Sequence, residues 1–174
     1  LEFEKYYNYG KKDGRWVYYY ETGELKEVEN YNDGKKDGQW LVYHANKKIK
    51  SEKYYTNDML NGTSTEYYKT GVLKKVENYN RGILDGDYTS YYKRGNKKEE
   101  GLYKQDKKEG LWIEYYENGE MKKERQYKDG VLERTEEEEQ IIEVLVVETV
   151  ETPDLVEELV DSIPQEEKVE EKVE

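Results

Sequence analysis

A glycine recurs every 24 residues through most of this chain, and this period constrains the fold more than any other feature. The glycines of the column are Gly14, Gly38, Gly62, Gly86 and Gly110. Two tyrosine columns keep the same step: Tyr19, Tyr43, Tyr67, Tyr91 and Tyr115, and Tyr7, Tyr31, Tyr55, Tyr79, Tyr103 and Tyr127. A period of this length indicates one supersecondary unit that is copied and stacked, each copy contacting mainly its neighbours. The function typical of such an array is binding.

Charge divides the chain into two parts near Arg134. Residues 1–134 hold 27 Lys and Arg against 25 Asp and Glu, a balance of +2, whereas residues 135–174 hold 2 against 16, a balance of −14. All aromatic side chains and glycines precede residue 131. Because tyrosine can bury its ring while its hydroxyl stays exposed to solvent, a thin sheet can be stabilised without a wide core. We therefore expect a folded repeat domain over 1–134 and a separate acidic tail over 135–174.

The first full unit, residues 14–37, contains two strand-like runs and two turn signals. Residues 16–20 are aromatic and β-branched, and they end at Thr22-Gly23, which predicts a tight hairpin turn. Residues 25–31 form the predicted return strand, and a second turn around Asp33-Gly34 links one hairpin to the next. The column glycines are also interpreted as turn residues. The fold class expected is all-β: an elongated antiparallel meander of hairpins, with a half unit at 1–13 and units starting at 14, 38, 62, 86 and 110.

Alternation along the strands assigns their residues to two faces. One face is expected to carry Val17, Leu41, Thr65, Thr89 and Ile113 with the column from Tyr19 to Tyr115. The other is expected to carry Trp16, Trp40, Ser64, Tyr88 and Trp112, and next to them Tyr18, Val42, Glu66, Ser90 and Glu114. Both faces are therefore aromatic.

The acidic tail carries weaker signals. An apolar run at 141–147 is compatible with a strand or a short helix, and Thr152-Pro153 resembles a helix start that leads to a helix over 153–163. The end of the chain, 165–174, has the composition of a disordered segment. Two roles for the tail remain open, namely covering the edge of the last hairpin and binding a partner.

Residues 110–124 and the following Tyr127-Lys128-Asp129-Gly130 resemble the variant membrane occupation and recognition nexus (MORN) repeat of bacterial YwqK-type antitoxin proteins. The pattern is also legible in 14–34 and 62–82, and the resemblance covers 1–134. It implies an elongated antiparallel sheet of consecutive hairpins and a role in protein binding, with some members acting as the immunity partner of a toxin. It carries no catalytic residues over to this chain.

Catalytic and cofactor-binding motifs are missing from the sequence. His44 is the only histidine and takes a tyrosine position, and without cysteine there is no Ser-His-Asp or Cys-His set and no zinc site. Glu66 and Glu114 share a face, which is more typical of a solvated strand than of a glycosidase pair. We expect neither an enzyme nor a cofactor or metal. A balance of +2 in the repeats and −14 in the tail also argues against nucleic acid.

The sequence therefore predicts a protein-binding repeat module, with neutralisation of a basic toxin as the specific hypothesis. Its expected contact residues are Trp16, Trp40, Tyr88, Trp112, Tyr20, His44, Tyr68, Tyr92 and Tyr116. The same residues are equally expected to pack between hairpins. A surface or scaffold protein, with the repeats as spacer or adhesin, is the alternative, and a carbohydrate-binding sheet is a third.

No apolar stretch approaches the roughly 20 residues of a membrane span. The start of the chain lacks the features of a signal peptide, and Leu1 aligns with Leu25 in mid-unit. A cytoplasmic location is the expectation, with export or the cell surface as the alternative.

Overall fold

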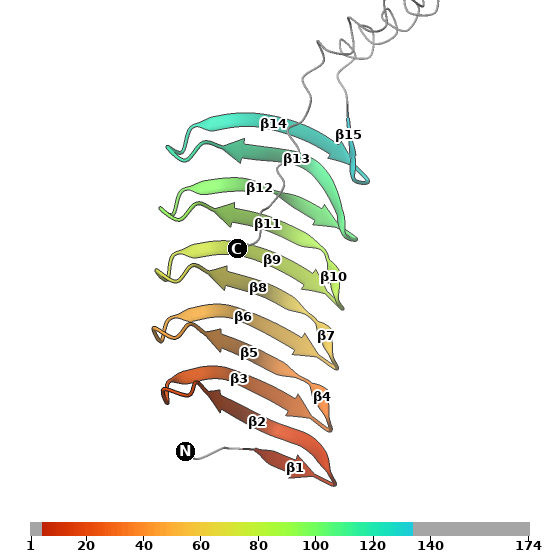
Figure 1. The fold of residues 1–174 in the computed structure, drawn as a ribbon. Helices are drawn as coiled ribbons and strands as arrows, with labels where there is room; N and C mark the ends of the chain where they lie inside the picture. The colour runs from red at the N-terminus through yellow and green to blue at the C-terminus, as the bar shows by residue number, and fades with distance from the viewer. Residues whose placement is uncertain (1–4, 134–174) are drawn as a thin grey trace, which may run out of the picture. The chain divides into compact units, whose positions relative to one another are not determined.

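The computed structural model describes residues 5–133, and this part of the chain forms one antiparallel sheet of fifteen strands (Figure 1). Each repeat contributes one long hairpin. These hairpins are β2 (Lys11–Tyr19) with β3 (Leu25–Asn32), β5 (Gly38–Tyr43) with β6 (Ile49–Thr56), β8 (Gly62–Tyr67) with β9 (Leu73–Asn80), β11 (Gly86–Tyr91) with β12 (Lys97–Lys104), and β13 (Lys107–Tyr115) with β14 (Met121–Lys128). The short strands are β1 (Tyr6–Asn8), β4 (Lys35–Lys36), β7 (Met59–Leu60), β10 (Ile83–Leu84) and β15 (Val131–Leu132).

The long strands follow one another across the sheet in chain order, and β4, β7 and β10 pair with β3, β6 and β9. In Figure 1 the hairpin loops lie along one side of the sheet and the short strands along the other. The predicted all-β meander of stacked hairpins is confirmed for these residues. The expected tail elements, including the helix over 153–163, lie outside the described residues.

The hairpin loops predicted at Thr22-Gly23 and the equivalent positions are one residue longer than the tightest, two-residue turn. Gly23 N donates to Tyr20 O over 2.9 Å and Tyr20 N donates to Glu24 O over 2.8 Å, so the loop is a three-residue turn closed by a bulge. Gly23 supplies the positive φ, +91°, as expected. Lys47 takes the same position in the second hairpin with φ +67°. The backbone of that loop is therefore held in a conformation that side chains disfavour.

The true two-residue turns lie between hairpins. Asn32 pairs with Lys35, and the two central residues, Asp33 and Gly34, have φ of +48° and +84°. Positive φ at both positions is what a type I′ turn requires, and its twist suits the flanking strands. The short strands therefore arise from these turns.

The glycines of the 24-residue column were predicted to be turn residues, and this was wrong. Gly38 follows β4 and starts β5, with φ +96°. Lys36 pairs with Tyr31, and Leu41 pairs with Val28. Two residues of β3 separate Val28 from Tyr31, whereas four residues separate Lys36 from Leu41, so the later segment contains two extra residues. The column glycine therefore lies at a bulge, where positive φ lets the chain bend from the short strand into the long one.

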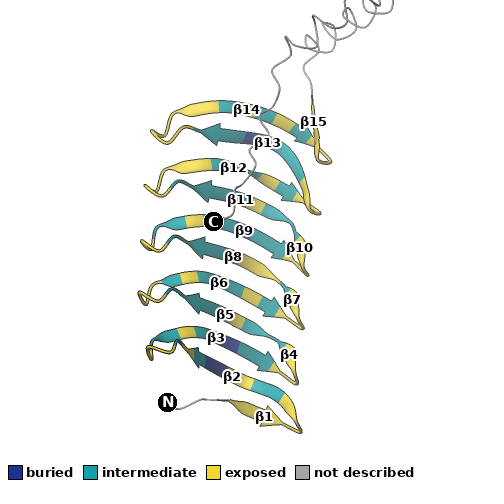
Figure 2. Ribbon diagram, viewed as in Figure 1, coloured by how far each residue is buried: buried dark blue, intermediate teal, exposed yellow. Residues whose placement is uncertain are grey.

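The register confirms the two predicted faces. Val17 and Leu41 both lie opposite Val28, on the side of the sheet that we call the tyrosine face. On the same face the Tyr115 hydroxyl donates a hydrogen bond to Glu100. Trp16 lies opposite Glu29 on the other side, which we call the tryptophan face. The core is thin, because its apolar members are few and lie near the two ends of the array (Figure 2): Trp16, Val17, Val28 and Trp112. Elsewhere most strand residues are half-buried or exposed.

Candidate binding surface

A row of directly opposed residues runs along the middle of the tryptophan face through ten strands. This central row consists of Tyr18, Glu27, Val42, Ser51, Glu66, Lys75, Ser90, Glu99, Glu114 and Lys123. Ion pairs connect its later members to their neighbours. Lys75 Nζ lies 3.9 Å from Glu66 Oε1 and 3.0 Å from Glu77 Oε1, and Lys108 Nζ lies 2.8 Å from Glu99 Oε1.

Beside the central row lies an aromatic row built from the tryptophan column and its neighbouring tyrosines. The ring centroid of Trp40 is 5.6 Å from that of Tyr31 and 5.1 Å from that of Tyr55, so the indole packs against both flanking strands. Its Nε1 donates to Asn30 O over 3.1 Å, the carbonyl that also accepts from Asp37 N at the bulge. Trp16 and Trp112 donate in the same way to Tyr6 O and Leu102 O. Each tryptophan thus ties its repeat to the preceding one.

The predicted contact residues of the tryptophan column divide by exposure. The side chains of Trp16 and Trp112 are only 2% and 3% exposed, whereas Trp40 and Tyr88 are half-buried. The Tyr88 ring contacts Trp112 at 5.4 Å and Tyr103 at 5.5 Å between centroids. The two buried indoles offer a partner little surface, and the half-buried pair offers more.

The second predicted column joins each repeat to the next. The hydroxyls of Tyr20, Tyr68 and Tyr92 donate to the backbone carbonyls of Tyr43, Tyr91 and Tyr115 over 2.6, 2.8 and 2.8 Å. His44 takes the corresponding position, with Nε2 3.3 Å from Tyr67 O. Tyr116, in the last repeat, is 50% exposed. Tyr20, His44, Tyr68 and Tyr92 thus have a structural role, and contact of this column with a partner stays a prediction.

Sequence reasoning missed a column of lysines that covers the tryptophans. Lys36 Nζ lies 4.2 Å from the ring centroid of Trp40, and Lys108 Nζ lies 3.8 Å from that of Trp112. Lys12 has the same relation to Trp16 at 4.4 Å. A signal was present: lysine stands four residues before each tryptophan, whereas Leu60 and Leu84 precede Ser64 and Tyr88. The cation–π contact between lysine and tryptophan is therefore present in the three repeats that have a tryptophan, and the other two repeats have leucine in place of the lysine.

Two carboxylates are buried on this face. Glu29 is 9% exposed and accepts from the Tyr31 hydroxyl over 2.9 Å, and Glu77 is 8% exposed and accepts from the Tyr79 hydroxyl over 3.2 Å. Burial and the charge of Glu77 raise the pKa of Tyr79 to about 12. Each buried carboxylate therefore has a phenol and a lysine, Lys12 or Lys75, as partners.

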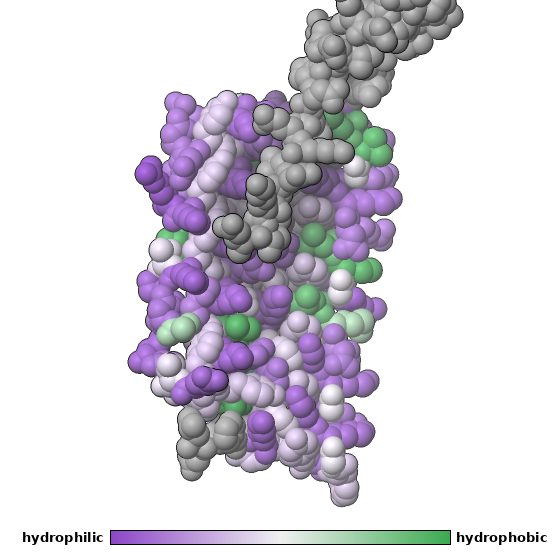
Figure 3. Space-filling view, viewed as in Figure 1, coloured by the Kyte–Doolittle hydropathy of each residue, from purple (hydrophilic) through white to green (hydrophobic). Residues whose placement is uncertain are grey.

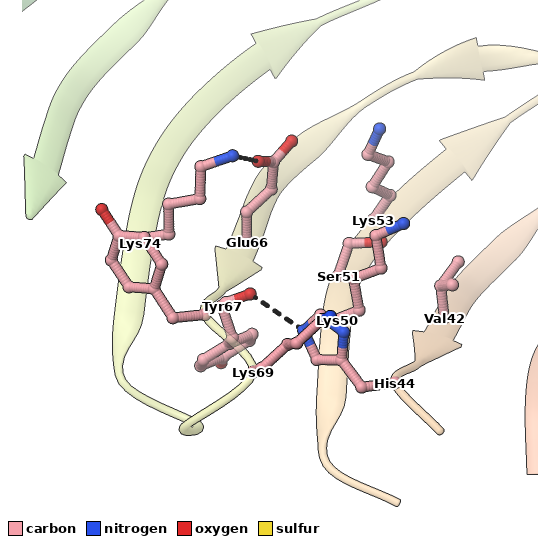
Figure 4. Close-up of a pocket in the computed structure, with 10 residues that line it drawn as sticks. Val42, His44, Lys50, Ser51, Lys53, Glu66, Tyr67, Lys69 and Lys74 are labelled. Atoms are coloured by element: carbon pink, nitrogen blue, oxygen red, sulfur yellow. Dashed lines mark hydrogen bonds and ion pairs between the residues drawn. The ribbon is translucent and has the colours of Figure 1, made fainter. Parts of the chain in front are cut away.

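A cavity of about 480 Å³ opens where the second and third repeats meet (Figure 4). The residues that line it are Val42, His44, Lys50, Ser51, Lys53, Glu66, Tyr67, Tyr68, Lys69 and Lys74. Lys74 Nζ donates to Glu66 Oε2 over 3.2 Å. Although burial opposes it, this bond and the charge of Lys75 lower the pKa of Glu66, so the carboxylate is ionised at neutral pH.

Five consecutive segments match the model of the MORN repeat variant: residues 12–33, 36–57, 60–81, 84–105 and 108–129. The chain belongs to the MORN repeat family. Each MORN match starts two residues before a column glycine, so it contains the bulge and the following long hairpin. MORN repeats usually form binding modules, and five consecutive copies of the repeat make up this part of the chain. No curated protein matches the chain.

Two further observations concern residues 5–133. No group of three or more His, Asp or Glu side chains there could hold a metal ion. The same part of the chain has no helix long and apolar enough to cross a membrane.

Proposed function

We propose that this chain is a non-enzymatic module that binds another protein through its tryptophan face. The observation that carries the proposal is the central row, a continuous line of residues through five repeats with half-buried aromatic side chains beside it. Tyrosine and tryptophan give large contact areas at low entropy cost, and polar residues around such anchors set specificity. Most of the visible surface is hydrophilic (Figure 3). A protein partner of mixed polarity suits this surface better than an apolar one.

The specific form of the proposal is an antitoxin that neutralises a basic toxin by direct binding. Two observations support it: the resemblance of the repeats to YwqK-type antitoxin proteins, and the charge balance of −14 in residues 135–174. A toxin that acts on nucleic acid needs a basic surface to bind phosphates. Opposite net charge on the two proteins would mainly raise their rate of association.

The experiment begins with capture of a partner from the native cell on the full chain, and its purification. Two single variants of β11 then compare the faces. Ser90→Arg places a bulky cation in the central row, whereas Thr89→Arg places the same side chain on the tyrosine face, one residue away. We expect Ser90→Arg to weaken partner binding at least tenfold and Thr89→Arg to change it less than threefold, measured by titration calorimetry.

Equal losses in both variants, or a loss with Thr89→Arg alone, would contradict binding through the tryptophan face. The antitoxin form has its own readout: expression of the partner should arrest growth, and co-expression of this chain should restore it. A captured envelope protein or polysaccharide that leaves growth unchanged would instead favour the scaffold or carbohydrate-binding alternative.

A further inference from the structure

We propose that the cavity between the second and third repeats receives an acidic segment of the protein partner, an inference that rests on the proposed function. The cavity lies on the tryptophan face, because Val42, Ser51 and Glu66 are consecutive members of the central row. This part of the face would thus bind carboxylate side chains, a ligand chemistry that the repeat pattern alone does not indicate.

The cavity exists because two adjacent members of the central row are small. Val42 and Ser51 lie opposite each other on β5 and β6. In the preceding hairpin the corresponding opposed pair is Tyr18 and Glu27, and in the fourth hairpin Glu99 stands where the second hairpin has Ser51. Among the five hairpins, two small residues therefore lie opposite each other in the central row only in the second. Its volume falls within the roughly 300 to 1,000 Å³ typical of ligand sites.

The lining of this cavity is strongly basic. Four lysines, Lys50, Lys53, Lys69 and Lys74, surround a single carboxylate, Glu66. Lys74 pairs with Glu66 (Figure 4), while Lys50, Lys53 and Lys69 have no ion-pair partner within 4 Å among residues 5–133. Elsewhere on the face the lysines of the central row are paired with glutamates. Three lysines without an ion pair in the described part of the chain line one cavity, and Lys53 acts on Glu66 only at longer range, which favours an anionic ligand.

The remaining walls are apolar or aromatic, which favours a peptide segment over a bare anion. Val42 lies beside the cavity together with the aromatic residues Tyr68 and His44, and Tyr67, whose column lies on the tyrosine face, borders it. A segment in which glutamates or aspartates flank an apolar residue would place carboxylates near the lysines and the apolar side chain against these rings. Amphipathic matching of this kind is typical of protein interfaces, where apolar anchors lie within a polar rim.

The test uses the full chain and a fluorescein-labelled peptide in which four glutamates surround a central leucine. We expect fluorescence anisotropy to show saturable binding of this peptide that weakens as salt is raised, and much weaker binding of the same peptide with glutamines. Every variant keeps residues 135–174, so the variants differ from the unmodified chain only at the substituted positions.

Two variants remove the site by different means. Lys50→Gln with Lys69→Gln neutralises two unpaired lysines and should weaken peptide binding about tenfold. Its matched control is Lys93→Gln with Lys98→Gln, which removes the same charge at the equivalent positions of the fourth hairpin and should change affinity less than twofold. Val42→Tyr fills the cavity with the residue that the first hairpin carries at this position, so the fold should tolerate it while binding is lost.

Equal effects of the two lysine pairs, or full binding by Val42→Tyr, would overturn the inference. Displacement of the peptide by inorganic phosphate or by a single-stranded DNA oligonucleotide at equal concentration would also overturn it, since the site would then take any anion. The captured partner separates this outcome from failure of the proposed function. Partner binding that survives Val42→Tyr but is lost with Ser90→Arg contradicts only the acidic-segment inference.

Discussion

The hydroxyl of Tyr68 donates a hydrogen bond to the backbone carbonyl of Tyr91, 2.8 Å away and one repeat further along the chain. Tyr20 and Tyr92 make the same contact with the repeats that follow them. A single hairpin is too small to be stable alone, so contacts of this kind between neighbours decide the stability of the array. Tyr20, Tyr68 and Tyr92 thus connect neighbouring repeats, whether or not they also contact a partner.

Tyr68→Phe removes one connector and keeps the ring. We expect the free energy of unfolding to fall by about 1 kcal/mol, because the Tyr91 carbonyl loses a partially buried donor. Chemical denaturation monitored by circular dichroism measures the change. Tyr116→Phe is the matched control, since its hydroxyl belongs to the last repeat and its side chain is half exposed; it should be neutral within about 0.5 kcal/mol. Equal losses in the two variants would refute the connector role.

Lys47 occupies a loop position that the other four hairpins give to glycine. Its φ of +67° is the left-handed region, which costs a side-chain-bearing residue roughly 1 to 2 kcal/mol. Lys47→Gly should therefore stabilise the chain by up to about 1 kcal/mol, after the larger entropy loss of glycine on folding is subtracted. Thermal denaturation measures it.

The reverse substitution in a matched loop tests the same argument. Gly95 has φ +97°, and a Cβ there would meet only Val72 Cγ1 at 3.7 Å. Gly95→Lys should consequently lose about 1 kcal/mol through backbone strain alone. A gain with Gly95→Lys, or a loss with Lys47→Gly, would show that loop contacts outweigh the φ preference.

Much of the fold was predictable because the 24-residue period and the alternation along strands are local signals. They gave the hairpins, the two faces and the positive φ of Gly23. The bulge at Gly38 was not predictable, since positive φ suits a turn and a bulge equally and only the pairing of Lys36 with Tyr31 distinguishes them. The cavity could not be found either. It depends on Val42 and Ser51 being opposite each other, which is set by the register between strands.

Gly101 packs so closely against Trp112 that a larger residue does not fit, a constraint that the repeat pattern does not reveal. It stands where other repeats have Glu29, Lys53, Glu77 and Arg125, yet a Cβ at this position would lie 2.3 Å from Trp112 Cδ2. We expect Gly101→Ala to destabilise the chain by about 1 to 3 kcal/mol through overpacking. In a Trp112→Tyr background, with the ring that the fourth repeat uses at Tyr88, the loss should be smaller. A double-mutant cycle measured by urea denaturation gives the coupling.

Tyr79 makes stability depend on alkaline pH. Burial and Glu77 raise the pKa of its phenol from 10 to about 12, so the folded state holds the proton more tightly than the unfolded state. The resulting stabilisation is fully present below pH 10 and is lost as pH rises from 10 toward 12. The ring is partly solvated, which reduces the expected contribution of Tyr79 to about 1 kcal/mol. Burial also raises the pKa of Tyr55, Tyr88 and Tyr103, which adds loss in the same direction.

Tyr79→Phe isolates this contribution. The variant should lose less stability between pH 10 and 12 than the unmodified chain, because its phenylalanine has no proton to release, and tyrosinate absorbance should show one fewer late-titrating phenol. Tyr9→Phe is the control, since Tyr9 is 99% exposed and its loss should leave the pH profile unchanged. An identical alkaline profile for Tyr79→Phe and the unmodified chain would mean that Glu77 does not hold the Tyr79 proton in the folded sheet.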